Sequence, residues 1–196
     1  MDRQPAFEDL VAALAPLPAR TTATEGWRPK VPVAEERLTP LGVTVVFTPD
    51  RTLPVASGSV DVVLNRHGRV DPAEAARALQ PGGTLLTQQV GSDDCAAINT
   101  ALGAPPAYST PWNADVAIAQ LSAAGFTIVD VRQEWPAFDF YDIGALVYQL
   151  RAVPWQVPDF TLDRYGASLR QIDEQIRAEG RFRAHAHRFR ISAQHG

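Results

Sequence analysis

Cysteine and lysine are almost absent from this chain of 196 residues, which contains one of each, Cys95 and Lys30. A single cysteine cannot form an internal disulfide or build a cysteine-rich metal site. A free thiol fits a reducing compartment, so we expect a cytoplasmic protein. No apolar run approaches the roughly 20 residues of a membrane span, and the acidic N-terminus lacks a signal-peptide pattern. We therefore expect no membrane partner.

A basic surface patch is also missing. The formal net charge is -4, whereas nucleic-acid-binding proteins usually carry a broad basic footprint. The arginines between Arg181 and Arg190 are spaced through FRAHAHRFRI, which is the pattern of a strand rather than a basic run. We therefore expect no nucleic-acid partner. The apolar fraction of 45% and the charged fraction of 20% are globular values, and we predict a single domain over residues 1–196.

Apolar periodicity predicts helices that alternate with strands. The helical pattern marks residues 5–14, 31–38, 71–80, 113–124, 140–153 and 162–176. Apolar β-branched or alternating runs mark strands over residues 19–25, 43–47, 59–64, 84–90, 126–131 and 182–193. Asp71 is the expected N-cap of its helix, and Pro81-Gly82-Gly83 is the expected turn into the strand that follows. This alternation is typical of an α/β fold with a mostly parallel sheet and helices on both faces.

One stretch carries a family resemblance. Residues 53–86, LPVASGSVDVVLNRHGRVDPAEAARALQPGGTLL, resemble the middle of class I S-adenosylmethionine-dependent methyltransferases of the type 11-like group, where LPF-x-D-x-SFD and L-x-PGG recur. The likeness extends more loosely from about Val11 to Ala193. It implies a Rossmann-like sheet whose last strand is antiparallel, and methyl transfer from S-adenosylmethionine to a small acceptor.

The resemblance also implies which residues would bind the cofactor. Glu25 ends the segment that matches the second strand of the family, where a carboxylate accepts hydrogen bonds from the ribose hydroxyls. Asp50 lies near the position of the acid that meets the adenine amine. Asn65 follows the segment that matches the fourth strand, close to the reacting centre.

The glycine-rich turn of the family is missing. The sequence has no glycine before Gly26, although glycine lets the backbone turn sharply and approach a cofactor closely. Residues 2–9, DRQPAFED, occupy its place, and we expect the first strand to be missing or replaced. A naturally shortened protein, weak or altered cofactor binding, and an artefact of the assigned gene start all remain open. Exposed sheet edges would favour a homodimer or pairing with a homologous subunit.

Histidines are predicted at the sheet edge where ligands bind in doubly wound folds. His67 follows the fourth-strand segment, and alternation along the last strand places His185 and His187 on one face. Imidazole titrates near neutral pH, so we predict His67 or His185 as a general base and His187 as a substrate contact. The alternative is that His185 and His187 are ordinary strand residues. Three imidazoles could also bind zinc, but no carboxylate is placed to help, and no metal is predicted.

Carboxamides and aromatic rings complete the predicted site. Gln88 and Gln89 close the fifth-strand segment and are expected to orient the substrate, with Gln88 part of the catalytic set. Residues 136–180 are predicted to be a helical insertion that shapes the substrate pocket. Tyr141 and Trp155 within it combine apolar bulk with polar groups, as small-molecule sites do. Alternatively, these rings only bury the C-terminal helix.

The sequence therefore predicts a methyltransferase-like enzyme with a degenerate S-adenosylmethionine site and histidine-assisted chemistry on a small molecule. Three alternatives stay open. The chain could be a cofactor-independent cyclase or isomerase on the same fold, a non-catalytic ligand-binding or self-resistance protein, or a pseudoenzyme subunit.

Overall fold

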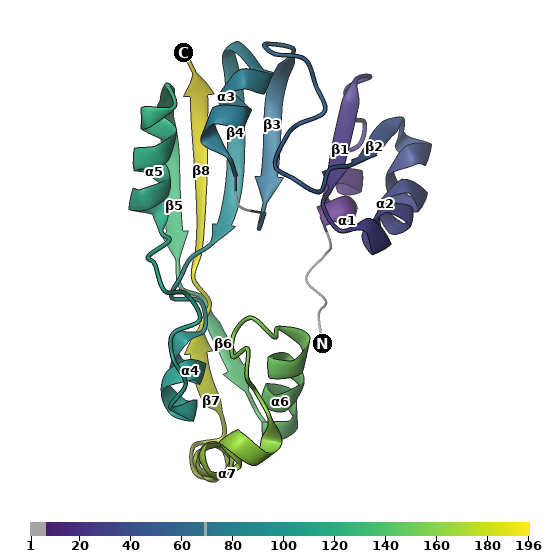
Figure 1. The fold of residues 1–196 in the computed structure, drawn as a ribbon. Coiled ribbons are helices and arrows are strands. Elements are labelled where there is room, and N and C mark those ends of the chain that lie inside the picture. The colour runs from purple at the N-terminus through teal and green to yellow at the C-terminus, as the bar shows by residue number, and fades with distance from the viewer. Residues whose placement is uncertain (1–6, 69) are drawn as a thin grey trace. The chain divides into compact units, whose positions relative to one another are not determined.

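The structure is a computed structural model that describes residues 7–68 and 70–196 (Figure 1). The chain forms two compact units. The first unit extends to Thr87 and includes Ala123–Thr127 and Ala193–Gly196, and the second contains Gln88–Ser122 and Ile128–Ser192. Pro5, where the first helix is predicted to begin, lies outside the described residues.

A parallel pair of strands opens the first unit. Strand β1 (Thr21–Glu25) pairs with β2 (Val43–Phe47), and Glu25 lies beside Phe47 at their carboxyl ends. The flanking elements are helix α1 (Phe7–Ala13), helix α2 (Val31–Leu38) and the 3-10 turns η1 (Arg28–Lys30) and η2 (Thr39–Leu41). Val11, Leu38 and Val43 form a small buried cluster. The predicted helix over 31–38 and the strand over 43–47 are confirmed at both ends.

Helix α3 (Pro72–Ala78) connects strand β3 (Val60–Arg66) to strand β4 (Leu79–Val90). The predicted N-cap is confirmed, because Asp71 Oδ1 accepts hydrogen bonds from the backbone N–H groups of Ala73 and Glu74 at 3.1 and 3.2 Å. The Glu74 side chain bonds to a residue outside the helix, because its Oε1 accepts the Leu53 N–H at 2.7 Å. Arg77 donates to Glu74 and to the carbonyls of Leu53 and Val55. Helix α3 therefore holds the loop that precedes β3.

The predicted turn at Pro81-Gly82-Gly83 is wrong, because β4 is extended from Leu79 onward. The two glycines allow the backbone to depart from regular strand geometry at this point. Gly82 has a φ of +77°, and a Cβ on Gly83 would lie 2.9 Å from the Gln80 carbonyl oxygen. Glycine is thus used here for close backbone packing and not to reverse the chain.

The main sheet has the strand order β3-β4-β8-β5, with β5 at Phe126–Glu134 and β8 at Arg188–His195. In Figure 1 the arrows of β3, β4 and β5 share one direction and that of β8 is reversed. Helix α5 (Ala114–Ala123) precedes β5, and Asn113 Oδ1 accepts the Val116 N–H at 3.0 Å, which caps the start of the helix. The predicted α/β class, with a mostly parallel Rossmann-like sheet and an antiparallel last strand, is confirmed.

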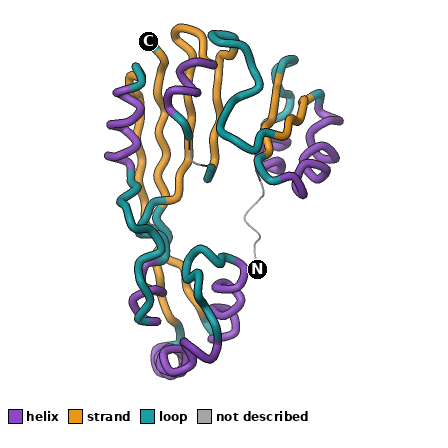
Figure 2. The backbone as a smooth tube through the Cα atoms, viewed as in Figure 1, coloured by secondary structure: helices purple, strands orange, loops and turns teal. Residues whose placement is uncertain are grey.

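The second unit also contains an antiparallel pair, β6 (Ala137–Phe140) with β7 (Phe182–His185), and three helices (Figure 2). The helices are α4 (Ala96–Leu102), α6 (Ile143–Ala152) and α7 (Leu162–Glu179). Two predictions need correction. Phe140 belongs to a strand, and α6 begins only after Asp142, whose Oδ1 accepts the Ala145 N–H at 2.8 Å. The predicted last strand is two strands, because the ladder breaks at Ala186-His187.

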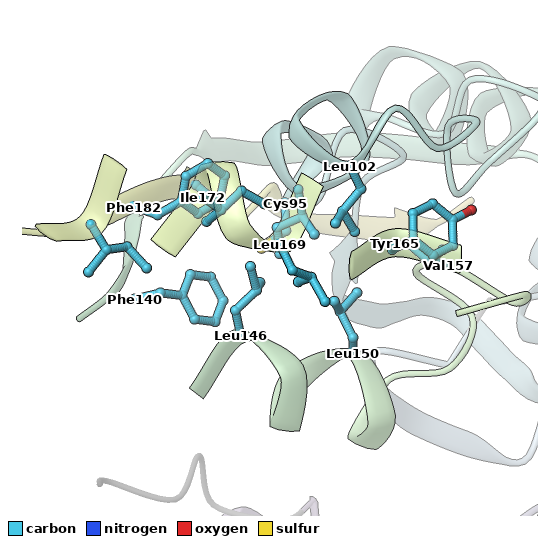
Figure 3. Packing of buried hydrophobic residues seen from close by; sticks show 13 residues of the cluster. Cys95, Leu102, Phe140, Leu146, Leu150, Val157, Tyr165, Leu169, Ile172 and Phe182 are labelled. Atoms are coloured by element: carbon cyan, nitrogen blue, oxygen red, sulfur yellow. The ribbon is translucent and has the colours of Figure 1, made fainter. Parts of the chain in front are cut away.

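A dense apolar cluster holds α4, α6, α7 and the β6-β7 pair together (Figure 3). Side chains from all of these elements point into it in Figure 3. Its buried members are Cys95, Ile98, Leu102, Phe140, Leu146, Leu150, Val157, Tyr165, Leu169, Ile172, Ile176, Phe182 and Ala184. The segment 136–180 thus consists of β6, α6 and α7, and its role as a substrate-pocket insertion stays a prediction. Within the described ranges, no helix is both long enough and apolar enough to cross a bilayer.

Candidate functional site

Carboxylates follow both strands of the β1-β2 pair at the carboxyl end. Glu25 is half-buried, and its Oε1 accepts the Trp27 N–H at 2.7 Å, which fixes the side chain at the strand end. Asp50 lies three residues beyond β2, is exposed, and accepts the Thr52 N–H at 3.0 Å. Both predicted cofactor acids therefore lie on the turns that leave parallel strands, which is where ligands bind in open α/β sheets.

Aromatic side chains accompany these acids. Trp27 follows Glu25 by two residues and is 62% exposed. The guanidinium carbon of Arg28 lies 4.1 Å from the centre of the Phe47 ring, a cation-π contact that fixes the turn after β1 against the end of β2. This end of the first unit therefore offers carboxylate acceptors beside an accessible indole.

The turn after β3 contains the first predicted histidine. His67 is exposed and has a φ of +61°, in the left-handed region that non-glycine residues rarely occupy. Asn65, two residues earlier, has its Oδ1 hydrogen-bonded to Thr87 Oγ1 on β4 at 2.9 Å. The end of β3 is thus attached to β4 two residues before His67.

His187 is the most enclosed histidine of the second unit, with 1% of its surface exposed. Its ring stacks on Trp135 at a centroid distance of 5.0 Å, and Nε2 lies 3.3 Å from Gln133 Oε1. The other face meets the loop after β4, because a Cβ on Gly91 would lie 2.1 Å from Nδ1. Nδ1 has no hydrogen-bond partner among the described residues. Burial lowers the pKa of His187, and the nearby carboxylate of Asp93 only partly opposes this.

Asp94 ties the loop after β4 to the junction between β7 and β8. Its Oδ1 accepts the His187 N–H at 2.9 Å and also binds the guanidinium of Arg188. Burial raises the pKa of the neighbouring Cys95 thiol to about 12, and Asp94 adds to the shift. Burial therefore disfavours the thiolate, which is the nucleophilic form of cysteine.

His185 and His187 do not share a face, contrary to the prediction. His185 is exposed and pairs with Ala137 across the β6-β7 ladder, whereas His187 is buried. The reason is the break in the ladder, where the Ala186 N–H donates to the Pro136 carbonyl at 2.9 Å and the alternation restarts in β8. Strand alternation applies only while the strand is continuous.

The remaining predicted residues are distributed over both units. Gln88 is half-buried and Gln89 is 2% exposed, both near the end of β4. Tyr141 and Trp155 are 68% and 59% exposed. Asn65 and His67 belong to the first unit, whereas His185 and His187 belong to the second, so a single pocket shared by these three imidazoles stays a prediction.

Two open cavities lie away from the predicted residues. One of about 410 Å³, in the second unit, is lined by Arg151, Phe160, Thr161, Leu162 and Asp163. The other, of about 330 Å³ in the first unit, is lined by Glu8, Asp9, Val33, Glu36 and Arg37. The cavity of the second unit is lined by residues of the segment 136–180, which the sequence predicted to shape a substrate pocket, whereas the cavity of the first unit was not predicted. Among the described residues, no group of three histidine, cysteine or acidic side chains is arranged to hold a metal ion.

The sequence prediction missed the partners of His187, which are Gly91, Asp93, Asp94, Gln133 and Trp135. One signal was available. The run Gly91-Ser92-Asp93-Asp94 directly follows a strand, where polar loops of α/β folds bind ligands or fix the site. Nothing local in the sequence brings Gln133 or Trp135 to this loop.

Comparisons with known proteins support the fold. A scan against protein-family models and a search of the curated proteins gave no match. Among solved structures, a candidate methyltransferase of Bacillus halodurans C-125 and the YcgJ protein of Bacillus subtilis both match with a TM-score of 0.66. Their identities are 14% and 15%, and each match covers 95% of this chain and 87% of the other.

The cyclase SpnF matches with a TM-score of 0.54 and 16% identity, over 95% of this chain and 68% of its own. Identities this low establish the fold and leave the activity open. The chain has the class I S-adenosylmethionine-dependent methyltransferase fold.

Proposed function

We propose that this chain is a methyltransferase-like enzyme that acts on a small molecule, with a nucleoside site at the ends of β1 and β2 and His67 as its general base. The observation that carries the proposal is the left-handed backbone of His67 directly after β3. Such conformations cost roughly 1–3 kcal/mol and concentrate at functional sites, where the surrounding structure imposes them.

The residues present fit the nucleoside part of S-adenosylmethionine. A carboxylate has about four acceptor positions, and Glu25 uses one of them for the Trp27 N–H. The remaining positions suit the two ribose hydroxyls. The exposed indole of Trp27 offers a face on which adenine could stack. Asp50 is a second carboxylate acceptor, suited to the adenine amine.

The amino-acid part of the cofactor fits less well. Residues 7–25 contain no glycine, so this stretch lacks the flexible turn with which a backbone closely approaches a ligand. We therefore expect weak binding of S-adenosyl compounds, governed by the nucleoside contacts.

His67 would move a proton in this reaction. When bound, S-adenosylmethionine supplies a methyl group on a sulfonium centre. The nucleophilic atom of the acceptor gains the methyl group and loses a proton, which the neutral imidazole of His67 accepts. Asn65, attached to Thr87, orients the turn that presents His67. His185 is a weaker candidate, because it lies on the exposed β6-β7 ribbon beside the Asp139–Arg183 ion pair.

His187 is better described as a positioning residue than as a substrate contact. Both faces of its ring are covered, by Gly91 and by Trp135, and its neutral form is favoured by burial. It therefore supports the loop that follows β4, and its exposure is too small for direct contact with a substrate.

Calorimetry with S-adenosylmethionine and S-adenosylhomocysteine tests the nucleoside site. We expect measurable but weak binding that Glu25→Gln reduces about tenfold, because a charged acceptor for two hydroxyls is lost. The matched control is Glu35→Gln, which changes an exposed acid on α2 and should leave affinity unchanged. No heat of binding for the unaltered chain, or equal loss in both variants, would refute the nucleoside site.

Turnover assays with a panel of small acceptors test the base. His67→Ala should lower kcat by roughly 100-fold or more, the usual contribution of a general base, and leave affinity for S-adenosylhomocysteine intact. A variant with full kcat at every pH tested would exclude His67 as the base.

A cofactor-independent cyclase or isomerase is the second candidate. It is favoured by the missing glycines and by the similarity to SpnF, a cyclase with this fold. Turnover that needs no S-adenosylmethionine and still depends on His67 would support this candidate over methyl transfer.

We also propose that the chain acts as a homodimer or pairs with a homologous subunit, in the cytoplasm. The support is the pair of edge strands β1 and β3, each with one partner strand in the sheet orders of the described chain.

A further inference from the structure

Strand β3 and its neighbour β4 share a face that can be assigned from one hydrogen bond. Thr87 Oγ1 and Asn65 Oδ1 are 2.9 Å apart, so both side chains project from the same side of the sheet. Side chains alternate along a strand. Val62 and Leu64 on β3 must therefore project from the opposite side, together with Leu86 on β4.

This opposite side is open to solvent. Val62, Leu64 and Leu86 are 52%, 43% and 40% exposed. On the covered side of β4, Leu85 and Thr87 are 0% and 3% exposed. Single exposed apolar side chains are common on protein surfaces, whereas a contiguous apolar group marks an interaction site.

The apolar group borders a sheet edge. Strand β3 stands at the end of the order β3-β4-β8-β5. Its sequence, VDVVLNR, contains no proline and no lysine, the residues that commonly prevent an edge strand from pairing with another chain. An apolar face and an unblocked edge thus occur together on one strand.

We propose that a second copy of this chain pairs with β3 in antiparallel orientation about a two-fold axis at Val63. This inference names the surface of the homodimer proposed above and rests on it. The two-fold axis stands perpendicular to the sheet, so the apolar side chains of both copies lie on the same face. A strand edge that serves both subunits equally is what a two-fold dimer requires.

The register is argued from complementarity along VDVVLNR. With Val63 at the centre, Val62 faces the partner's Leu64, and the symmetric pair repeats this contact. Asp61 faces the partner's Asn65, an acceptor opposite an amide, and Val60 faces the partner's Arg66. All seven residues of β3 are paired, and no like charges meet.

Neighbouring registers are less favourable. A centre at Val62 pairs only five residues and places the Asp61 carboxylate opposite the partner's Val63. A centre at Leu64 also pairs only five residues, moves Val62 opposite the partner's Arg66, and leaves the two Leu64 side chains as the one apolar cross-strand pair. The centre at Val63 alone pairs all seven residues, with Val62 opposite Leu64 twice and Val63 opposite the partner's Val63.

Sedimentation velocity of the full chain at micromolar concentrations tests the proposal. We expect a dimer whose Kd rises about tenfold in Val62→Lys, because the substitution changes two symmetry-related cross-strand pairs. The matched control is Val129→Lys on β5, at the far end of the sheet order, where the side chain is 59% exposed. Both substitutions are at exposed positions, so both proteins should fold, and circular dichroism checks this.

A double variant tests the register itself. In Val62→Lys with Leu64→Glu, each introduced lysine lies opposite the introduced glutamate of the other subunit, so dimerisation should recover toward the original Kd. Recovery is not expected in any register that separates positions 62 and 64.

Three results would overturn the inference: a monomeric unaltered chain, a dimer that Val62→Lys leaves intact, or equal weakening by Val129→Lys. The last two would point to a different surface or a different chain as the occupant. Calorimetry with S-adenosylhomocysteine is independent of these outcomes, because Glu25 lies on β1. A dimer that Val62→Lys weakens as predicted, but that gives no heat of binding with S-adenosylhomocysteine, would refute only the nucleoside site. A monomer that binds S-adenosylhomocysteine would refute only the interface.

Discussion

The cluster of β6, β7, α4, α6 and α7 in the second unit is larger than the cluster of the α1, α2 and β1-β2 layer in the first. In the second unit, thirteen buried residues from five elements and their connections form one cluster. In the first unit, the described part of the α1, α2 and β1-β2 layer has a cluster of three buried residues, Val11, Leu38 and Val43, and further buried side chains lie on α3 and β4. Strands β3 and β4 leave Val62, Leu64 and Leu86 exposed. The cluster of the second unit is thus the larger of the two, and the first unit leaves a group of apolar side chains exposed on its sheet.

This contrast predicts that tightly packed positions of the second unit tolerate substitution poorly. The largest effect is expected for Gly91→Ala, because the new Cβ would overlap the His187 ring at 2.1 Å. Overpacking of this kind costs about 3 kcal/mol of unfolding free energy. Gly166→Ala in α7 is the control: its Cβ would lie 3.7 Å from Arg170 Nη1, and alanine favours the helix by about 1 kcal/mol. Urea unfolding of both variants measures the two changes in unfolding free energy. Equal stability of Gly91→Ala and Gly166→Ala would contradict the close packing of Gly91 on the His187 ring.

A buried amide pair should give the next largest effect. Asn99 Nδ2 donates to the main-chain carbonyl of Gln156 at 2.9 Å, and Gln156 Nε2 donates to Asn99 Oδ1 at 2.6 Å. Gln156→Ala leaves the buried Asn99 amide without this donor and should cost about 2 kcal/mol. The cost should fall when Asn99→Ala is already present, because the two residues act as a unit. Additive losses in urea unfolding would show that the pair does not connect α4 to the segment after α6.

In the first unit, Glu74→Gln should cost about 1 kcal/mol at neutral pH, because hydrogen bonds from Arg77 and Leu53 to a charged acceptor are weakened. These bonds lower the pKa of Glu74 from 4.5 to about 2. The folded-state pKa is depressed, so the stabilisation is complete above about pH 4.5 and disappears as the pH falls toward 2. The stability difference between the two proteins should therefore shrink on acidification. A constant difference would contradict the Glu74–Arg77 anchor.

The smallest effect has the opposite sign. His67→Gly should raise the unfolding free energy by about 0.5–1 kcal/mol, because glycine adopts a φ of +61° without steric cost. Turnover should fall in the same variant. Asparagine also tolerates this backbone region but lacks the conformational freedom of glycine. The His67→Asn variant therefore tests the relief of backbone strain separately from the effect of that freedom. A destabilised glycine variant in thermal unfolding would mean that the backbone at His67 is not strained.

Local signals predicted much of the first unit. Asp71 with Pro72 specified the start of α3, and apolar β-branched residues specified β2 over Val43–Phe47. Helix α4 was missed because its N-cap position is Cys95, which lies at a φ of +51° and makes no side-chain cap. The local sequence pattern suggested that Phe140 belongs to a helix. It could not show the pairing of β6 with β7, because that pairing joins residues more than forty positions apart.

The site was predictable only where it depends on strand ends. Glu25 is the last residue of β1, and Asp50 and His67 lie on the turns after β2 and β3, as the order of elements implied. The burial of His187 was not predictable, because Gly91 and Trp135 reach it from other parts of the chain. The separation of His185 from His187 depends on the Ala186 hydrogen bond to Pro136, which no local pattern reveals.

Amide hydrogen exchange with and without S-adenosylhomocysteine tests the contrast between the two units most directly. Without ligand, amides of α7 and of the β6-β7 pair should exchange far more slowly than those of β1 and β2, because exchange follows local packing. With ligand, β1 and β2 should gain protection and α7 should not change. Equal protection of both units without ligand, or no gain at β1 and β2 with it, would contradict the account.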